Sequence, residues 1–134
     1  MKVVTALLSD WANISNDGRI NMLGAGIDRV NIAIAPSKEK PIRGQFMLVV
    51  RIERDIGEEG LHTLQVLVVE PDGNRIGDMQ VQFTADKKFN NAIFGIMGIP
   101  LYQLGPHSFE VLIDGHNMIS LPIDVVLTQG QAGS

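Results

Sequence analysis

The sequence predicts an all-β protein, and three observations support this prediction. Apolar and polar residues alternate in stretches such as 79–83, 109–113 and 119–125, the period of strands with one face on a core and one in water. These stretches stop where Gly, Pro, Asp or Asn supplies a turn. No window of about 11 residues has a convincing helical period. We expect an antiparallel two-sheet β-sandwich of about nine strands with Greek-key, immunoglobulin-like connections, and keep a closed barrel as the structural alternative.

The first half of the chain is expected to hold four strands. The first strand stops before Asp17-Gly18, a dipeptide that favours a hairpin because Gly adopts positive φ without a Cβ clash. Gly24 and Gly26 bend the chain after the second strand. Two prolines bracket a polar loop over 35–41, which breaks the sheet because proline donates no ladder hydrogen bond. These four strands are expected over residues 2–14, 19–23, 29–34 and 44–54.

The second half begins with an acidic loop over 55–60. The strand after it has two apolar faces, which favours a central position in a sheet. Pro71-Asp72-Gly73-Asn74 is a typical four-residue turn. We interpret 86–91 as a loop with at most one helical turn, and 98–104 as an irregular arm. The remaining strands are expected over residues 61–70, 75–83, 92–97, 107–113 and 118–127. One domain over 1–128 and a flexible tail over 129–134 complete the prediction.

Composition excludes several function classes. The chain of 134 residues has no cysteine, which excludes disulfides, thiolate metal sites and a cysteine nucleophile. A net charge of −4 with scattered Lys and Arg argues against nucleic acid or an anionic membrane as partner. The apolar N-terminal run is interrupted by Asp10 and is too short for a signal peptide. No run approaches the ~18 apolar residues of a membrane span. We therefore expect a cytoplasmic protein.

The motifs that resemble catalytic or cofactor sites do not meet the requirements of that chemistry. Gly24-Ala25-Gly26 begins like a dinucleotide fingerprint, but Arg29 occupies the place of the third glycine and a strand follows instead of a helix. The histidines have no paired metal-ligand spacing. Ser108 adjoins His107, but neighbours on a strand point to opposite faces. We predict no catalytic residue, no metal site and no cofactor, and keep a carboxylate-pair hydrolase as a third hypothesis.

The sequence also predicts the environment of three single residues. His107 shares the parity of apolar residues on its strand, so we expect it to be hydrogen-bonded at the margin of the core. His116 lies in a turn and is expected to be solvated, and the role of His62 stays open. Trp11, the one tryptophan, is expected to fill the core rather than to serve as a stacking platform.

The segment over 93–102 is more apolar than a single amphipathic strand requires. It is interpreted either as a core strand covered on both faces or as a contact with another subunit. The residues that would form this contact are Ile93, Phe94, Ile96, Met97, Ile99, Leu101 and Tyr102.

Two runs of sequence resemble a known family. The first contains Asp17-Gly18-Arg19-Ile20 followed by Leu23-Gly24-Ala25-Gly26-Ile27-Asp28, and the second is Gly105-x-His107-x-Phe109-x-Val111-x-Ile113-Asp114-Gly115. With these runs the chain is similar to a family of small bacterial and phage proteins known as a domain of unknown function. The resemblance implies a β-sandwich, and it implies no activity and no catalytic residue.

These observations favour a non-enzymatic interaction or structural module that self-associates or binds another protein. The alternative is a protein that binds or sequesters a small ligand such as a metabolite or nucleotide. Its site would lie at Gly24, Gly26 and Asp28, near the polar loops 36–41 and 55–60, because loops on a rigid scaffold commonly carry binding sites.

Overall fold

A computed structural model describes residues 1–128 and contains ten strands. The tail expected over 129–134 lies outside the described residues. Within the described residues, no helix is long and apolar enough to cross a membrane. The strands are β1 (Lys2–Ser9), β2 (Trp11–Ile14), β3 (Ile20–Leu23), β4 (Arg29–Ile32), β5 (Ile42–Glu53), β6 (Gly60–Val69), β7 (Arg75–Ala85), β8 (Phe89–Leu101), β9 (Gly105–Ile113) and β10 (His116–Leu127).

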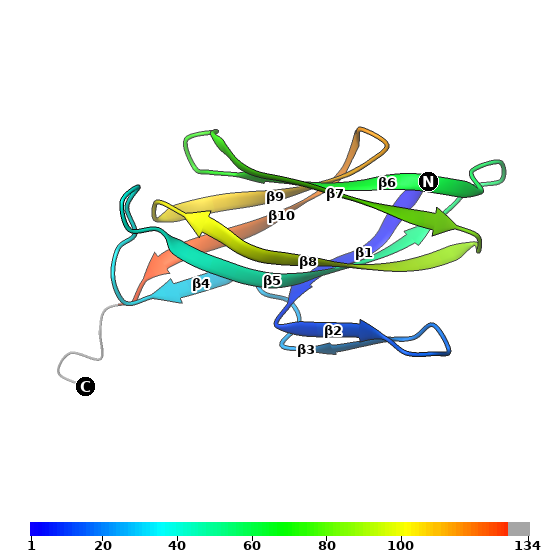
Figure 1. Cartoon of the computed structure of the whole chain (residues 1–134), viewed down its shortest axis with the longest axis horizontal. Coiled ribbons are helices and arrows are strands. Elements are labelled where there is room, and N and C mark those ends of the chain that lie inside the picture. The colour runs from blue at the N-terminus through cyan, green and yellow to red at the C-terminus, as the bar shows by residue number, and fades with distance from the viewer. Residues whose placement is uncertain (129–134) are drawn as a thin grey trace.

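The strands form a sandwich of two main sheets (Figure 1). The three-stranded sheet has the order β1-β5-β8, and the five-stranded sheet has the order β4-β10-β9-β6-β7. Consecutive strands β5–β6, β7–β8 and β8–β9 lie in different sheets, which is the Greek-key connectivity of immunoglobulin-like domains. The all-β sandwich is therefore confirmed. The sheets are separate ladders, so the alternative of a closed barrel does not describe this fold.

The first expected strand is in fact divided between two sheets. β1 pairs antiparallel with β5 in the three-stranded sheet, and β2 pairs antiparallel with β3 in a separate two-stranded sheet. β4 pairs parallel with β10 and is the exception in an otherwise antiparallel architecture. The main-chain amides of Gly26 and Ile27 donate to the carbonyl of Leu8 at 2.8 and 3.1 Å. These bonds bring the chain back to the end of β1, so β2 and β3 form a hairpin inserted where the chain changes sheets.

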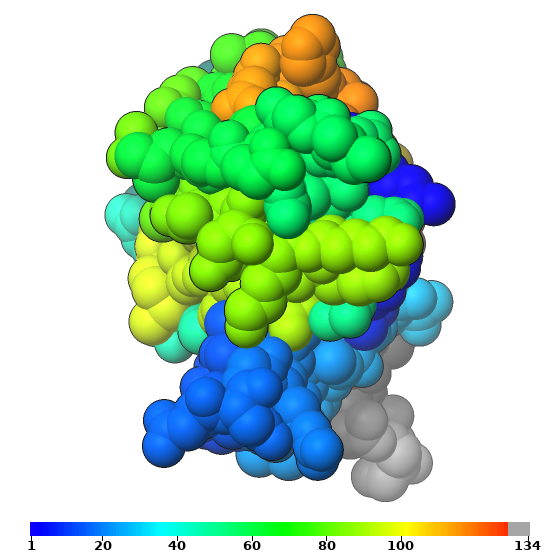
Figure 2. All heavy atoms as spheres, turned by 90° about the vertical axis from the view of Figure 1, so that its right-hand side faces the viewer, coloured from blue at the N-terminus to red at the C-terminus, as the bar shows by residue number. Residues whose placement is uncertain are grey.

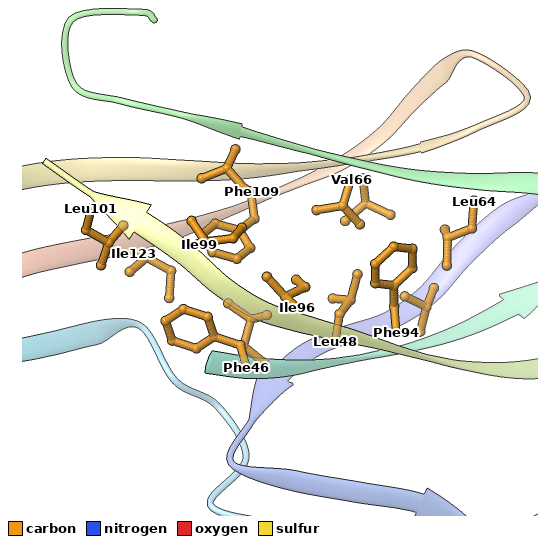
Figure 3. Close-up of a cluster of buried hydrophobic side chains, with 14 of the residues drawn as sticks. Phe46, Leu48, Leu64, Val66, Phe94, Ile96, Ile99, Leu101, Phe109 and Ile123 are labelled. Atoms are coloured by element: carbon orange, nitrogen blue, oxygen red, sulfur yellow. The ribbon is translucent and has the colours of Figure 1, made fainter. Parts of the chain in front are cut away.

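The hydrophobic core lies between the two main sheets (Figure 3). Phe46 of β5 and Phe109 of β9 meet edge to face across the layers, with ring centroids 5.5 Å apart. Alternation along each strand places every second side chain here, and burying one such side chain contributes about 1.5–3 kcal/mol. The largest side chains buried between the sheets include Leu8, Leu48, Ile52, Leu64, Ile96, Leu101, Phe109 and Ile123.

The β2–β3 hairpin covers part of the outer face of the three-stranded sheet (Figure 1). Val49 points away from the core and is nevertheless buried, as is Ala12 of the hairpin. The Asn91 side-chain amide of β8 donates to the Gly18 carbonyl at 2.9 Å and holds the hairpin tip. Trp11 is half-exposed opposite Leu23. The prediction that Trp11 fills the core is therefore wrong, because the hairpin buries its Ala12 face instead.

Three expected boundaries are also wrong. The first strand ends at Ser9 and the chain resumes as β2, and the strand expected to reach residue 34 ends at Ile32. β8 extends from Phe89 to Leu101, so it includes part of the expected loop and most of the expected irregular arm. The cause is a β-bulge: the register with β5 shifts at Gly98, whose φ is +70°, and the strand continues beyond it.

Candidate functional site

The apolar segment for which the sequence leaves core and interface as alternatives belongs mainly to the core. Phe94, Ile96, Ile99 and Leu101 of β8 are buried between the sheets and do not form a surface for a partner. Ile93 and Tyr102 are partly buried, and Met97 is 63% exposed on the outer face. The bulge at Gly98 explains why so many residues face inward, because it shifts the alternation from even to odd positions.

The glycine bend expected to hold a ligand is a tight turn. Gly24 and Gly26 have φ of +63° and +88°, and a Cβ at Gly24 would overlap the Asp10 carboxylate. Gly26 and Asp28 line an apolar groove of about 160 Å³ with Leu8 and other residues. Ligand pockets are commonly about 300–1,000 Å³. Both glycines are thus explained by the return from the hairpin.

A larger cleft lies beside the acidic loop between β5 and β6. Its volume is about 480 Å³, and Arg54, Asp55, Glu59 and Lys88 are among its charged lining residues. Figure 2 shows this end of the sandwich, with the β5–β6 loop in green, the β7–β8 turn in yellow-green and the hairpin tip in blue below. Among residues 1–128, no three acidic or histidine side chains are grouped so as to hold a metal ion.

His62 connects three elements at the same end of the molecule. Its Nδ1 lies 2.5 Å from an Asp114 carboxylate oxygen, and its Nε2 lies 2.6 Å from the Glu58 carbonyl oxygen. Because both partners accept hydrogen bonds, the ring satisfies both only as imidazolium. The hydrogen bonds to Asp114 and then to Glu58 raise the pKa of His62 above its ordinary value. Conversely, His62 and the Thr63 amide lower the pKa of Asp114. His62 thereby joins β6 to the β5–β6 loop and the β9–β10 turn.

The outer face of the five-stranded sheet carries a polar cluster around Glu110. Desolvation raises the pKa of Glu110, but hydrogen bonds from Ser120, Ser108 and Asn117 outweigh it and leave the pKa below its ordinary value. The Ser108 hydroxyl donates to the Glu110 carboxylate at 2.8 Å, and the Asn117 side-chain amide donates to it at 3.2 Å. The carboxylate is thus held ionised by hydroxyl and amide groups that lie on β9 and β10.

Three of the four edges of the main sheets are interrupted or occupied. β1 bulges at Val4, and the Leu8 carbonyl accepts two hydrogen bonds from the returning chain. β8 is interrupted in its last four residues, where it bulges at Gly98 and contains Pro100, and the Gly98 carbonyl accepts a hydrogen bond from the Arg43 guanidinium at 3.0 Å. β4 has only four residues. Bulges, prolines and short length are devices by which proteins prevent edge-to-edge pairing.

The fourth edge, β7, has none of these devices over most of its length. Its register with β6 shifts only at Ile76, next to its first residue, and residues 77–85 are regular. Their one charged residue is Asp78, and they contain no proline. Within the described chain, the main chain of β7 makes no main-chain hydrogen bond beyond its ladder with β6. An edge of this kind presents unpaired N–H and C=O groups to another strand.

Side chains on β7 also expose apolar surface. Met79, Val81 and Phe83 pair with Val66, Leu64 and His62 and therefore point toward the core side of the sheet. Met79 and Phe83 are partly buried against the core. Val81 is 41% exposed although its neighbour Leu64 is fully buried. Val81 thus exposes apolar surface beside a core that is itself buried at Leu64 and Val66.

Sequence reasoning did not identify either β7 or the His62–Asp114 pair as a site. The alternation over 79–83 predicts the strand, but its position at an edge depends on which strands pair. Asp114 was expected in a turn, and its positive φ of 50° places its carboxylate beside a strand that lies 52 residues earlier. No local signal in the sequence indicates either neighbour.

The model of a protein family described as a family of unknown function, DUF6941, matches residues 4–126. The chain belongs to this family. The match runs from β1 to β10, so the DUF6941 region includes both main sheets and the inserted hairpin. The resemblance to a family without assigned activity is confirmed, and bacterial or phage origin stays a prediction. No curated protein matches this DUF6941 chain.

Proposed function

We propose that this DUF6941 protein is a non-enzymatic interaction module that self-associates through an open sheet edge. The observation that carries the proposal is the regular, nearly uncharged stretch 77–85 at the edge of the five-stranded sheet. Val81 within it is exposed on the core side. Strand addition to such an edge supplies main-chain hydrogen bonds, and the side chains that flank it supply specificity.

This proposal moves the expected contact from β8 to the neighbouring edge strand β7. The two strands contact each other at the side of the sandwich, but β8 directs most of its large side chains into the core. A partner that pairs with β7 would cover the exposed flank of Val81 without disturbing the core residues.

Analytical ultracentrifugation of the whole chain over a wide range of concentrations tests this function. The proposal predicts a sedimentation coefficient that rises with concentration toward a defined oligomer. A monomer that persists over the whole range would contradict self-association. Moderate salt should weaken this association little, because hydrogen bonds and apolar contacts dominate the edge.

The cleft beside the β5–β6 loop supports small-ligand binding as a second candidate function. Its volume of about 480 Å³ falls within the usual range of ligand sites. Its lining carries both signs of charge, from Arg54 and Lys88 and from three carboxylates. A thermal-shift screen with nucleotides, amino acids and sugar phosphates tests it, since a ligand at 100 times its Kd stabilises by about 2.7 kcal/mol. An unchanged Tm with every compound would remove this candidate.

A further inference from the structure

The regular part of β7 suits pairing with a second copy of itself. Residues 77–85 pair with β6 without interruption, and Val81 is their midpoint. Two identical strands that pair antiparallel about a two-fold axis use the same surface on both copies and close after two subunits. An axis at Val81 would let the whole regular stretch of each copy take part.

Side chains match in this register. On the core side, Val81 would face Val81 of the partner subunit, and Met79 would face Phe83 of the partner subunit. Both pairs would extend the apolar core across the junction, and such cross-strand pairs each contribute roughly 0.2–1 kcal/mol. On the outer face, Gln80 would face Gln82 of the partner subunit, which pairs one amide with another.

Charges disfavour two of the alternative registers. The net charge of −4 repels two copies in general, so the contact must avoid adding to that repulsion. With the axis at Val81, Asp78 lies opposite the uncharged Thr84 of the partner subunit. Moving the axis to Gln82 would place Asp78 opposite Asp86 of the partner subunit, and moving it to Asp78 would oppose two aspartates. Like charges directly opposite each other destabilise a strand pair.

We propose that two copies of this chain pair antiparallel along β7, with the two-fold axis at Val81, and so join their five-stranded sheets into one. This inference rests on the proposed function and specifies the surface and symmetry of the self-association. The partner is a second copy of the chain, because in this register the edge opposes apolar with apolar and amide with amide side chains and brings no like charges together.

A matched pair of valine substitutions tests the surface. Val81→Lys places two ammonium groups opposite each other at the axis, whereas Val4→Lys makes the same change on the edge strand β1. The two valines are 41% and 46% exposed, so both variants are expected to fold, which circular dichroism checks. Sedimentation should show at least a tenfold weaker dimer for Val81→Lys and an unchanged dimer for Val4→Lys.

Disulfide trapping tests the register, because the chain has no cysteine of its own. Opposed residues of an antiparallel pair have Cα atoms about 4.5–5.5 Å apart, within the range that a disulfide spans. Val81→Cys should therefore form a covalent dimer rapidly on mild oxidation. Asp78→Cys should not, since its symmetry mate would lie six residues along the strands, roughly 20 Å away.

Each outcome separates the register from the function. Loss of the dimer in Val81→Lys alone, with rapid trapping of Val81→Cys alone, supports the proposal. A dimer equally stable in both lysine variants, with slow trapping at both cysteine positions, overturns the β7 pairing but leaves self-association through another surface. A wild-type chain that is monomeric throughout overturns both.

Discussion

The edge-to-face contact between Phe46 and Phe109 allows a quantitative prediction about how the two layers hold together. The rings come from different sheets, with centroids 5.5 Å apart and planes at 89°. Phe109 is fully buried, and Phe46 is nearly so. We consider Phe46→Leu, Phe109→Leu and the double variant, because leucine keeps an apolar side chain while it removes the ring.

The magnitude follows from burial and from the pair geometry. Each single substitution deletes buried carbon and leaves a small void, which should lower the free energy of unfolding by about 1–2 kcal/mol. The ring pair should add a coupling of about 0.5–1.5 kcal/mol beyond burial. The double variant should therefore lose less than the sum of the two single losses by that amount.

Urea unfolding of the four proteins, followed by far-UV circular dichroism, measures this cycle at a concentration where all four are in the same oligomeric state. The m-values should agree, which shows that the change lies in stability and not in the unfolded state. A coupling of zero within error would refute the reasoning. It would show that the rings contribute only their buried area and that the cross-sheet geometry adds nothing.

Two further predictions concern the His62 contacts and the glycine turn after the hairpin. His62→Gln should lower the free energy of unfolding at pH 6 and leave it nearly unchanged at alkaline pH. The pKa of His62 is raised in the folded state by Asp114 and Glu58. Their stabilisation is therefore complete below the pKa of His62 in the unfolded chain, and it is lost as the pH rises through the pKa in the folded protein. Thermal unfolding as a function of pH measures this, and an equal loss at all pH values would contradict it. Gly24→Ala should lower the free energy of unfolding by about 1–3 kcal/mol, because the φ of residue 24 is positive and the new Cβ would overlap the Asp10 carboxylate. A Tm equal to that of the wild type would contradict the turn geometry.

Much of the fold follows from the period of the strands alone. The alternation around Phe109 and Val111 predicts both the strand and its buried face, and both are confirmed. His107 shares this parity, and its Nδ1 lies 2.9 Å from the Gly105 carbonyl oxygen, as the expected hydrogen bond requires. The side chain lies deeper than the expected core margin, and its Nε2 is buried without a hydrogen-bond partner among the described residues. Local pattern suffices at these positions because burial of one face depends only on the direction of each side chain.

The failures occur where the structure depends on contacts between distant residues. The first strand has a continuous β-like pattern, but it divides at Asp10 because Leu8 takes hydrogen bonds from the chain beyond the hairpin. For the segment around Ile96, the sequence leaves core and interface as alternatives. This segment lies in the core because the bulge at Gly98 returns the next apolar residues to the same face. The residues of a strand do not by themselves indicate how the neighbouring strands align with it.

The position of the candidate site could not be predicted for the same reason. The residues of β7 were predicted as a strand, but only the order of strands in the sheet makes it an edge. Gly24 and Gly26 form the bend that their sequence also suggested, whereas the hydrogen bond from the Asp124 amide to the Asp28 carbonyl was not predicted. Non-enzymatic function and a cytoplasmic location stay predictions.

Hydrogen exchange of the β7 amides tests the central claim most directly. In an edge strand, alternate amides bond to the neighbouring strand and the others point to solvent. If two copies pair along β7, the outward amides of residues 77–85 should exchange rapidly in dilute protein and become protected as concentration rises, while β1 amides do not change. Outward β7 amides that exchange equally fast at all concentrations at which the protein associates would contradict the account.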